Sequence, residues 1–68
     1  MEKVKYLVER LYPSIKSSSK IAEFDYEADA KEYCRLRKIA DGGEYRAIRF
    51  SYTEEEIFST IVVENPEE

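Results

Sequence analysis

Carboxylates and tyrosines are the chemically active groups that this sequence supplies most often. The chain has 68 residues, with 15 Asp and Glu, six Tyr, one Cys and no His. Without His, neither Cys34 nor a serine has the usual base that would activate it as a nucleophile. A zinc site would lack most of its ligands. Cys34 is therefore interpreted as a small core residue, and the sequence predicts no catalytic residue and no enzyme.

Two short acidic groups and one arginine are the candidates for binding a partner. They are Glu27, Asp29 and Glu32, then Arg37, then Glu54, Glu55 and Glu56. Three adjacent glutamates in a loop seldom form a cation cage, and no calcium-loop pattern surrounds them. No phosphate-binding glycine loop is present, because the pair Gly42-Gly43 is better explained as a helix stop. The sequence thus predicts neither a metal nor a cofactor.

The net charge of −4 narrows the class of partner. Nucleic acids and anionic membranes are bound by an excess of Lys and Arg, which this chain lacks, so direct binding to either is not expected. The sequence shows no signal peptide and no apolar run long enough to span a membrane. The single cysteine fits a reducing compartment, so a cytoplasmic location is predicted.

One α-helix is predicted within Asp25–Gly43. Asp25 is the expected N-cap, acidic residues follow it, basic residues fill the last turns, and Gly42 closes the helix. The expected apolar face comprises Tyr26, Ala30, Tyr33 and Ala40, with Cys34 and Leu36 on its flanks. Arg37 lies in the middle of this stripe. Either its stem packs while its head reaches solvent, or the head contacts an anion or a partner.

Strands are expected on both sides of the helix. Met1–Tyr12 fits both periodicities, and its β-branched and aromatic content favours a strand over a second helix. Pro13–Lys20 is predicted as a loop, and Ile21–Phe24 as the returning strand. After the helix, two strands are expected, at Glu44–Tyr52 and Ile57–Glu64, with a break at Thr53–Glu56. On the last strand, Ile57, Ile61 and Val63 are expected to share one face, opposite Phe58 and Val62.

The predicted fold class is α+β, with the order β-β-α-β-β and one helix packed on one face of an antiparallel sheet. Residues 1–68 are predicted to form a single domain, with 65–68 expected as a loose tail. One helix covers one face only, so the opposite apolar face is expected to be buried by a second copy or by another protein.

A local resemblance adds a functional expectation. The stretch IAEFDYEADAKEYCRLRK, from Ile21 to Lys38, resembles the strand, cap and helix of very small bacteriophage accessory and inhibitor proteins, among them anti-CRISPR proteins. The resemblance implies a protein that acts by binding another protein, in the host cytoplasm if the chain is phage-encoded. It covers about a quarter of the chain and transfers no binding residue.

Two functions follow as hypotheses. In the first, the chain is an acidic inhibitor or adaptor that occupies a basic surface of a partner, which includes the phosphate-binding surface of a nucleic-acid-binding protein. In the second, it is a structural or assembly protein that forms a homodimer through its sheet. Salt separates them, because charge-led binding weakens with ionic strength and apolar association does not.

Overall fold

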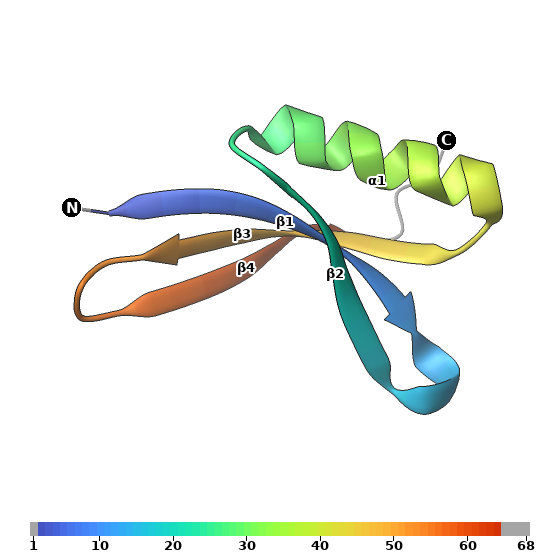
Figure 1. Ribbon diagram of the computed structural model, residues 1–68, viewed down its shortest axis with the longest axis horizontal. Coiled ribbons are helices and arrows are strands. Elements are labelled where there is room, and N and C mark those ends of the chain that lie inside the picture. Colours follow the sequence, from blue (N-terminus) through green and yellow to red (C-terminus); the bar gives the residue numbers. More distant parts are fainter. Residues whose placement is uncertain (1, 65–68) are drawn as a thin grey trace.

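The computed structural model describes residues 2–64 and has the predicted α+β fold (Figure 1). The strands are β1 (Lys3–Tyr12), β2 (Ser17–Phe24), β3 (Glu44–Tyr52) and β4 (Ile57–Glu64), and the helix is α1 (Glu27–Asp41). The order β-β-α-β-β is confirmed, and Lys3–Tyr12 is a strand rather than a second helix. The predicted loose tail, 65–68, lies outside the described residues.

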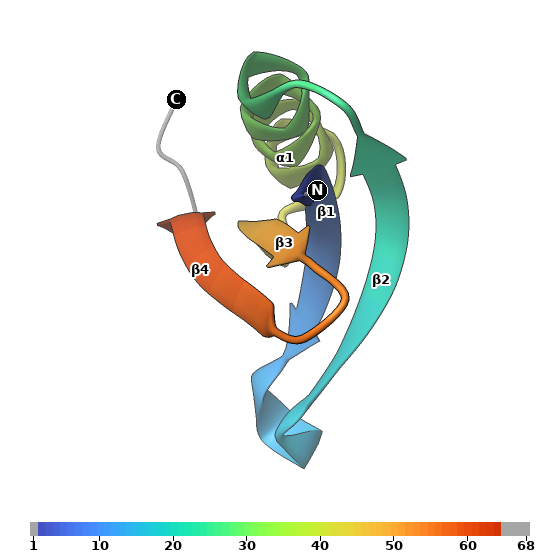
Figure 2. The same ribbon diagram turned by 90° about the vertical axis from the view of Figure 1, so that its left-hand side faces the viewer.

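The four strands form one antiparallel sheet in the order β2-β1-β3-β4. β1 and β3 are therefore central, whereas β2 and β4 are the edges. α1 leaves the β2 edge, crosses one face and returns the chain to β3 beside β1 (Figures 1 and 2). Among the described residues nothing covers the other face, here called the open face.

The core lies where α1 meets the centre of the sheet. Val8, Ala30, Cys34, Tyr45 and Ala47 are fully buried. The small side chains of Ala30 and Cys34 let the helix approach the strands closely, and Tyr45 is the largest of the fully buried side chains. This core is small because only one of the two sheet faces contributes to it.

The packing face of α1 is rotated from the predicted one. Ala30 and Cys34 are its buried residues, whereas Tyr26 is 71% exposed and Ala40 is also exposed. Tyr33 is half-buried, with its ring centroid 5.4 Å from that of Phe24. Placing Cys34 on the flank was wrong, because Ala30 and Cys34 are four residues apart and lie one above the other on the same helix face.

The predicted N-cap was also wrong. The helix begins at Glu27 after an extended Tyr26, and no side chain caps its first turn. Asp25 is instead held by Lys5 of β1, with 2.6 Å between Nζ and Oδ1. The predicted helix stop is confirmed: Gly42 has φ of 69°, and its N–H donates to the Lys38 carbonyl oxygen at 2.8 Å. A residue without Cβ adopts this left-handed conformation at no steric cost.

β2 is longer than predicted. It begins at Ser17, so only Pro13–Lys16 of the expected loop forms the connection, as a 3-10 turn followed by Lys16 with φ of 52°. The serines pair with Tyr12, Leu11 and Arg10. Serine has modest strand propensity, but β1 offers backbone partners along its whole length, and tertiary pairing overrides that preference.

A bulge in β4 changes which residues face the helix. Ala47 pairs with Val63, but the next residue, Ile48, pairs with Ile61, so Val62 is the extra residue. One extra residue reverses the alternation of faces. Val63 therefore packs against the core, and the expectation that it shares a face with Ile57 and Ile61 was wrong. No helix among the described residues is long and apolar enough to cross a membrane.

Candidate protein-binding surface

Three rows of paired side chains from β1, β3 and β4 lie on the open face between the β3–β4 hairpin and the Glu9–Arg46 ion pair. The strand registers define them as Leu7, Ile48 and Ile61; then Lys5, Phe50 and Ser59; then Lys3, Tyr52 and Ile57. Directly opposite residues in an antiparallel pair project to the same side of the sheet. The rows therefore place six apolar side chains on this face, with Ser59 on β4 and the two lysines on β1. Phe50 and Tyr52 contact each other, with ring centroids 5.7 Å apart.

The most exposed apolar side chains of the sheet lie on β4. Ile57 is 70% exposed, Phe58 56% and Ile61 51%. β4 ends the sheet, so among the described strands only β3 pairs with it. No charged residue occurs from Ile57 to Val63. An uncharged, apolar edge strand is a ready template for association with another chain.

The loop before β4 is acidic and locally ordered. Glu54, Glu55 and Glu56 are all exposed. The Thr53 hydroxyl accepts from the backbone N–H groups of Glu55 and Glu56 at 3.2 and 3.1 Å, and the Thr53 N–H donates to the Glu56 carbonyl at 2.9 Å. Within the described chain, none of these three carboxylates has an ion-pair partner. The loop thus presents three unneutralised charges beside Ile57.

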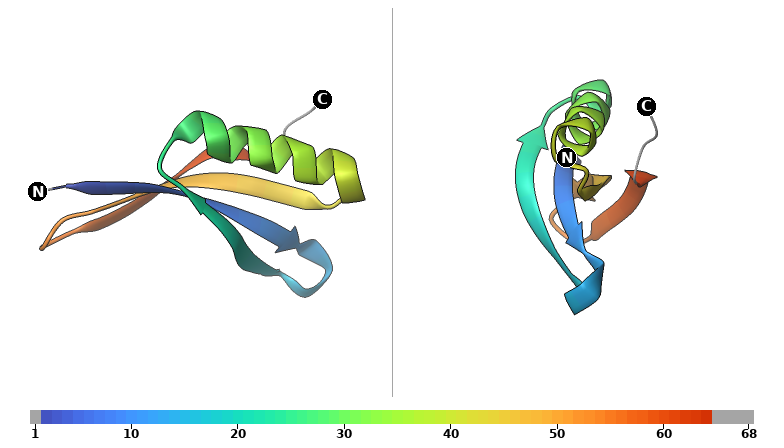
Figure 3. Two further views of the ribbon diagram at one scale, coloured as in Figure 1. Left: turned by 45° about the horizontal axis from the view of Figure 1, so that its top comes forward. Right: turned by 90° about the vertical axis from the view of Figure 1, so that its right-hand side faces the viewer.

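An open hollow of about 370 Å³ lies where this loop meets β1, and its lining comprises Lys3, Tyr52, Thr53 and Glu54. It combines an aromatic surface with one charge of each sign. Such a hollow suits a single side chain rather than a small molecule, since ligand pockets enclose most of their occupant. The hollow continues the open face toward the β3–β4 hairpin. This hairpin projects past the N-terminal end of α1 (Figure 3).

The helix acids differ from the loop acids. Glu27 pairs with Lys31 at 3.1 Å, and Glu32 pairs with Arg35 at 2.5 Å, both within the helix. Of the three, only Asp29 is exposed without an ion pair among the described residues. These acids lie on α1, above the covered face, while Glu54–Glu56 lie at the tip of the β3–β4 hairpin (Figure 1). The structure therefore separates the predicted acidic residues into two places and leaves the hairpin group the more available.

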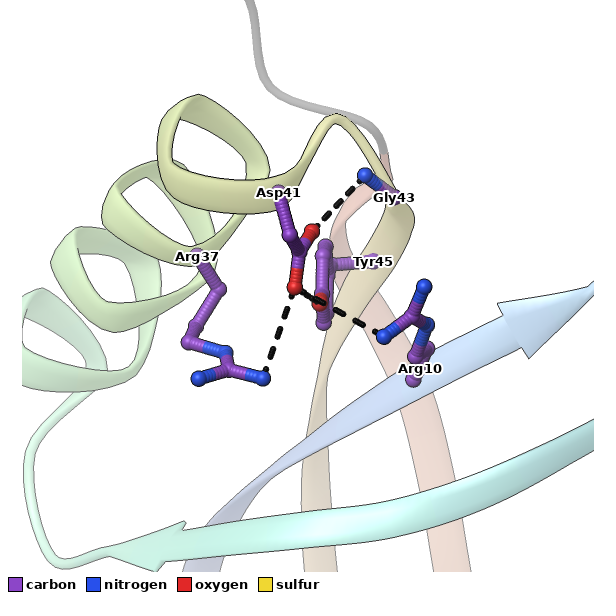
Figure 4. Close-up of polar contacts among 5 residues, drawn as sticks. All are labelled: Arg10, Arg37, Asp41, Gly43 and Tyr45. Carbon is purple, nitrogen blue, oxygen red and sulfur yellow. Dashed lines mark hydrogen bonds and ion pairs between the residues drawn. The ribbon is translucent and has the colours of Figure 1, made fainter.

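Arg37 lies apart from both acidic groups, in a polar cluster at the C-terminal end of α1 (Figure 4). Its guanidinium lies 3.4 Å from Asp41 Oδ2, and that of Arg10 lies 3.6 Å from the same oxygen. The Tyr45 hydroxyl donates to Oδ2 at 2.5 Å, and the Gly43 N–H donates to Oδ1 at 2.8 Å. Asp41 therefore joins the helix end to β1 and β3.

The titration of this cluster follows from its contacts. The Tyr45 hydroxyl, and after it the Gly43 N–H, lower the pKa of Asp41. Burial, and after it the hydrogen bond to Asp41, raise the pKa of Tyr45. The hydrogen bond to Tyr45 raises the pKa of Arg37. The hydroxyl thus accepts from Arg37 and donates to Asp41. Both guanidiniums also lie over the Tyr45 ring, 5.6 and 5.9 Å from its centroid.

This cluster fixes the helix end rather than offering a free binding group. The side chain of Arg37 is 43% exposed, and its guanidinium contacts the Asp41 carboxylate of the same chain, so neither of the two predicted interpretations describes it fully. The sequence pattern did not single out Arg10, Asp41 or Tyr45 as a group. Their separation along the chain carries no signal, because the β1–β3 register alone places Arg10 opposite Tyr45.

Two features of the described residues bear on nucleophilic and metal chemistry. They are the burial of Cys34 and the spacing of the acidic side chains. Cys34 is fully buried, and burial raises the pKa of its thiol. A protonated, inaccessible thiol is a poor nucleophile. Within residues 2–64, no three Asp, Glu, Cys or His side chains converge closely enough to hold a metal ion. The hairpin glutamates in particular do not form such a group.

The available surface is therefore the open face together with the β4 edge and the acidic hairpin. Its apolar part was predicted as an uncovered face, but the sequence did not show that β4 is an edge. No known family model, curated protein or solved structure matches this chain.

Proposed function

We propose that this chain is a protein-binding module, without catalytic activity, that occupies a basic surface of a partner protein. The observation that carries the proposal is the exposure of Ile57 and Ile61, at 70% and 51%, beside the carboxylates of Glu54–Glu56, which have no ion-pair partner within residues 2–64. Apolar anchors next to a concentration of charge are typical of an interface that is steered electrostatically and held by burial.

The binding energies expected from the two isoleucines and from the hairpin carboxylates differ, so the two groups have different roles in binding. Burying the exposed portions of Ile57 and Ile61 contributes about 2–4 kcal/mol. A micromolar complex needs about 8 kcal/mol, so the remaining apolar surface of β3 and β4 must also be covered. Exposed ion pairs add little each, about 0.2–1 kcal/mol. The carboxylates of the hairpin therefore select a basic partner and speed association more than they hold the complex together.

The chemistry of the partner follows from the charge. Three adjacent carboxylates suit a Lys- or Arg-rich surface, and such surfaces occur where proteins bind nucleic-acid phosphates. An acidic module on that surface competes with phosphate for the same side chains. The resemblance of Ile21–Lys38 to small phage inhibitors supports this role, and it makes the host cytoplasm the proposed location.

A comparison of two lysine substitutions tests the proposal. Ile61→Lys charges the open face, and Ile39→Lys is a matched control, since Ile39 is 47% exposed on α1. Each immobilised variant and the wild type are incubated with bacterial cytosol, and the retained proteins are compared. We expect a protein that wild type and Ile39→Lys retain, that Ile61→Lys loses, and that salt releases. Equal retention by all three would refute the proposal.

The uncovered row of Leu7, Ile48 and Ile61 favours a second candidate, a homodimer formed through the open faces. Its salt dependence has the opposite sign. Two copies that each carry a net charge of −4 repel one another, so salt strengthens their association while it weakens binding to a basic partner. Sedimentation equilibrium at low and high salt distinguishes the two.

A further inference from the structure

The outer edge of β4 has the properties of a strand acceptor. We propose that the partner adds an extended segment to this edge, antiparallel to β4, with apolar side chains at alternate positions and Lys or Arg residues after them. The inference rests on the proposed function and specifies its binding mode. Strand addition draws affinity from main-chain hydrogen bonds and specificity from alternate side chains.

The bulge limits the length of the acceptor. From Ile57 to Ile61 the pairing of β4 with β3 is regular, and Val62 then interrupts it. The regular stretch places Ile57, Ser59 and Ile61 on the open face. An added strand directly opposite would bring its own apolar side chains within about 4.5–5.5 Å of the two isoleucines. The small side chain between them leaves room for a large one from the partner.

The two edges of the sheet differ, and the difference points to β4. The β2 edge is polar: three serines occupy Ser17–Ser19, and Lys20 and Glu23 follow. Polar and charged side chains, Lys above all, are how edge strands avoid pairing with other chains. β4 has no charged side chain from Ile57 to Val63.

The charges at the two ends of β4 indicate which kind of strand can pair with its outer edge. Glu54–Glu56 precede β4, and Glu64 ends it. A second copy paired antiparallel about Ser59 would bring Glu54 of each chain toward Glu64 of the other, which places like charges together. A Lys or Arg segment places opposite charges there instead. The edge therefore favours a basic strand over a second copy.

Direction follows from the position of the glutamates. They lie at the start of β4, and an antiparallel partner strand passes that point with its C-terminal end. The basic residues of the partner must therefore come after its apolar stretch. An antiparallel strand with the reverse order would bring its basic residues to Glu64 alone, and it could meet the three glutamates only by pairing parallel to β4.

A synthetic peptide tests strand addition to β4 without the natural partner. The probe is a peptide of alternating Val and Thr followed by three lysines, and its controls are the same peptide with three glutamates and the reversed sequence. Amide hydrogen exchange of the full chain is followed by NMR. We expect the lysine-ended probe to slow exchange in β4 and not in β2, and the two controls to bind at least about tenfold more weakly.

Two triple variants test whether the probe binds through the hairpin carboxylates or through the general attraction of a basic peptide to an acidic protein. One changes Glu54, Glu55 and Glu56 to Gln, and the other changes the three helix acids, Glu27→Gln, Asp29→Asn and Glu32→Gln. Both remove three charges. The hairpin variant should weaken probe binding about tenfold, and the helix variant no more than about twofold.

Several results would overturn the inference. They are equal weakening by the two triple variants, protection of β2 instead of β4, preference for the reversed peptide, the absence of probe binding, and protection of β4 by self-association without the peptide. The proposed function survives each of these if the lysate still yields a protein that depends on Ile61. It fails separately if no such protein is retained.

Discussion

Truncating Val8 tests whether α1 and the sheet pack as described. Val8 is fully buried at the centre of β1, in a core cluster with Ala30, Cys34 and Ala47. Val8→Ala removes two methyl groups, which account for about 1.6 kcal/mol by transfer. The cavity left beneath the helix adds roughly 1 kcal/mol. The expected loss is therefore about 2–3 kcal/mol.

That loss is a large part of the total free energy of unfolding. A chain of this length is stabilised by about 3–10 kcal/mol, so Val8→Ala should lower the melting temperature by about 10–20 °C. Urea unfolding followed by far-ultraviolet circular dichroism measures the change. The dependence of the unfolding free energy on urea should stay the same, because the surface exposed on unfolding is nearly unchanged.

Ile57→Ala is the matched control. It truncates another β-branched residue, but one that is 70% exposed on β4. We expect a loss below about 0.5 kcal/mol, together with weaker partner binding if the proposed surface is correct. A loss below about 1 kcal/mol for Val8→Ala, or a larger loss for Ile57→Ala, would refute the assignment of the covered and open faces.

Further predictions concern α1 and its end. Tyr33→Ala should cost about 1–3 kcal/mol in urea unfolding, less than for a fully buried ring, because Tyr33 is half-buried. Gly42→Ala should cost about 1–2 kcal/mol in the same assay, entirely from φ of 69°, since an added Cβ meets no atom within 4 Å. The lowered pKa of Asp41 stabilises the fold above its ordinary value of 3.8, and this contribution is lost as the pH falls through the lower folded value. Tyr45→Phe should reduce that acid sensitivity in melting experiments at pH 2–5, and an unchanged profile would contradict the assigned hydrogen bond.

The sequence by itself determined the elements and most of their ends. Glu44–Tyr52 and Ile57–Glu64 are the observed bounds of β3 and β4, and Gly42 closes the helix as expected. These features are local. Strand bounds follow from β-branched runs between turn residues, and the helix stop follows from a glycine that tolerates positive φ. The absence of His likewise limits the acid–base and metal chemistry open to this chain, whatever fold it adopts.

Only the tertiary structure decided which groups meet. Alternation along a strand defines two faces, but it does not say which face the helix covers or which strand is an edge. The bulge at Val62 reversed the expected side of Val63, because one extra residue shifts the period of two. The β1–β3 register brought Arg10 opposite Tyr45, and Lys5 reached Asp25 across 20 residues. Such pairings depend on sheet order and register, which long-range backbone pairing fixes and local sequence does not.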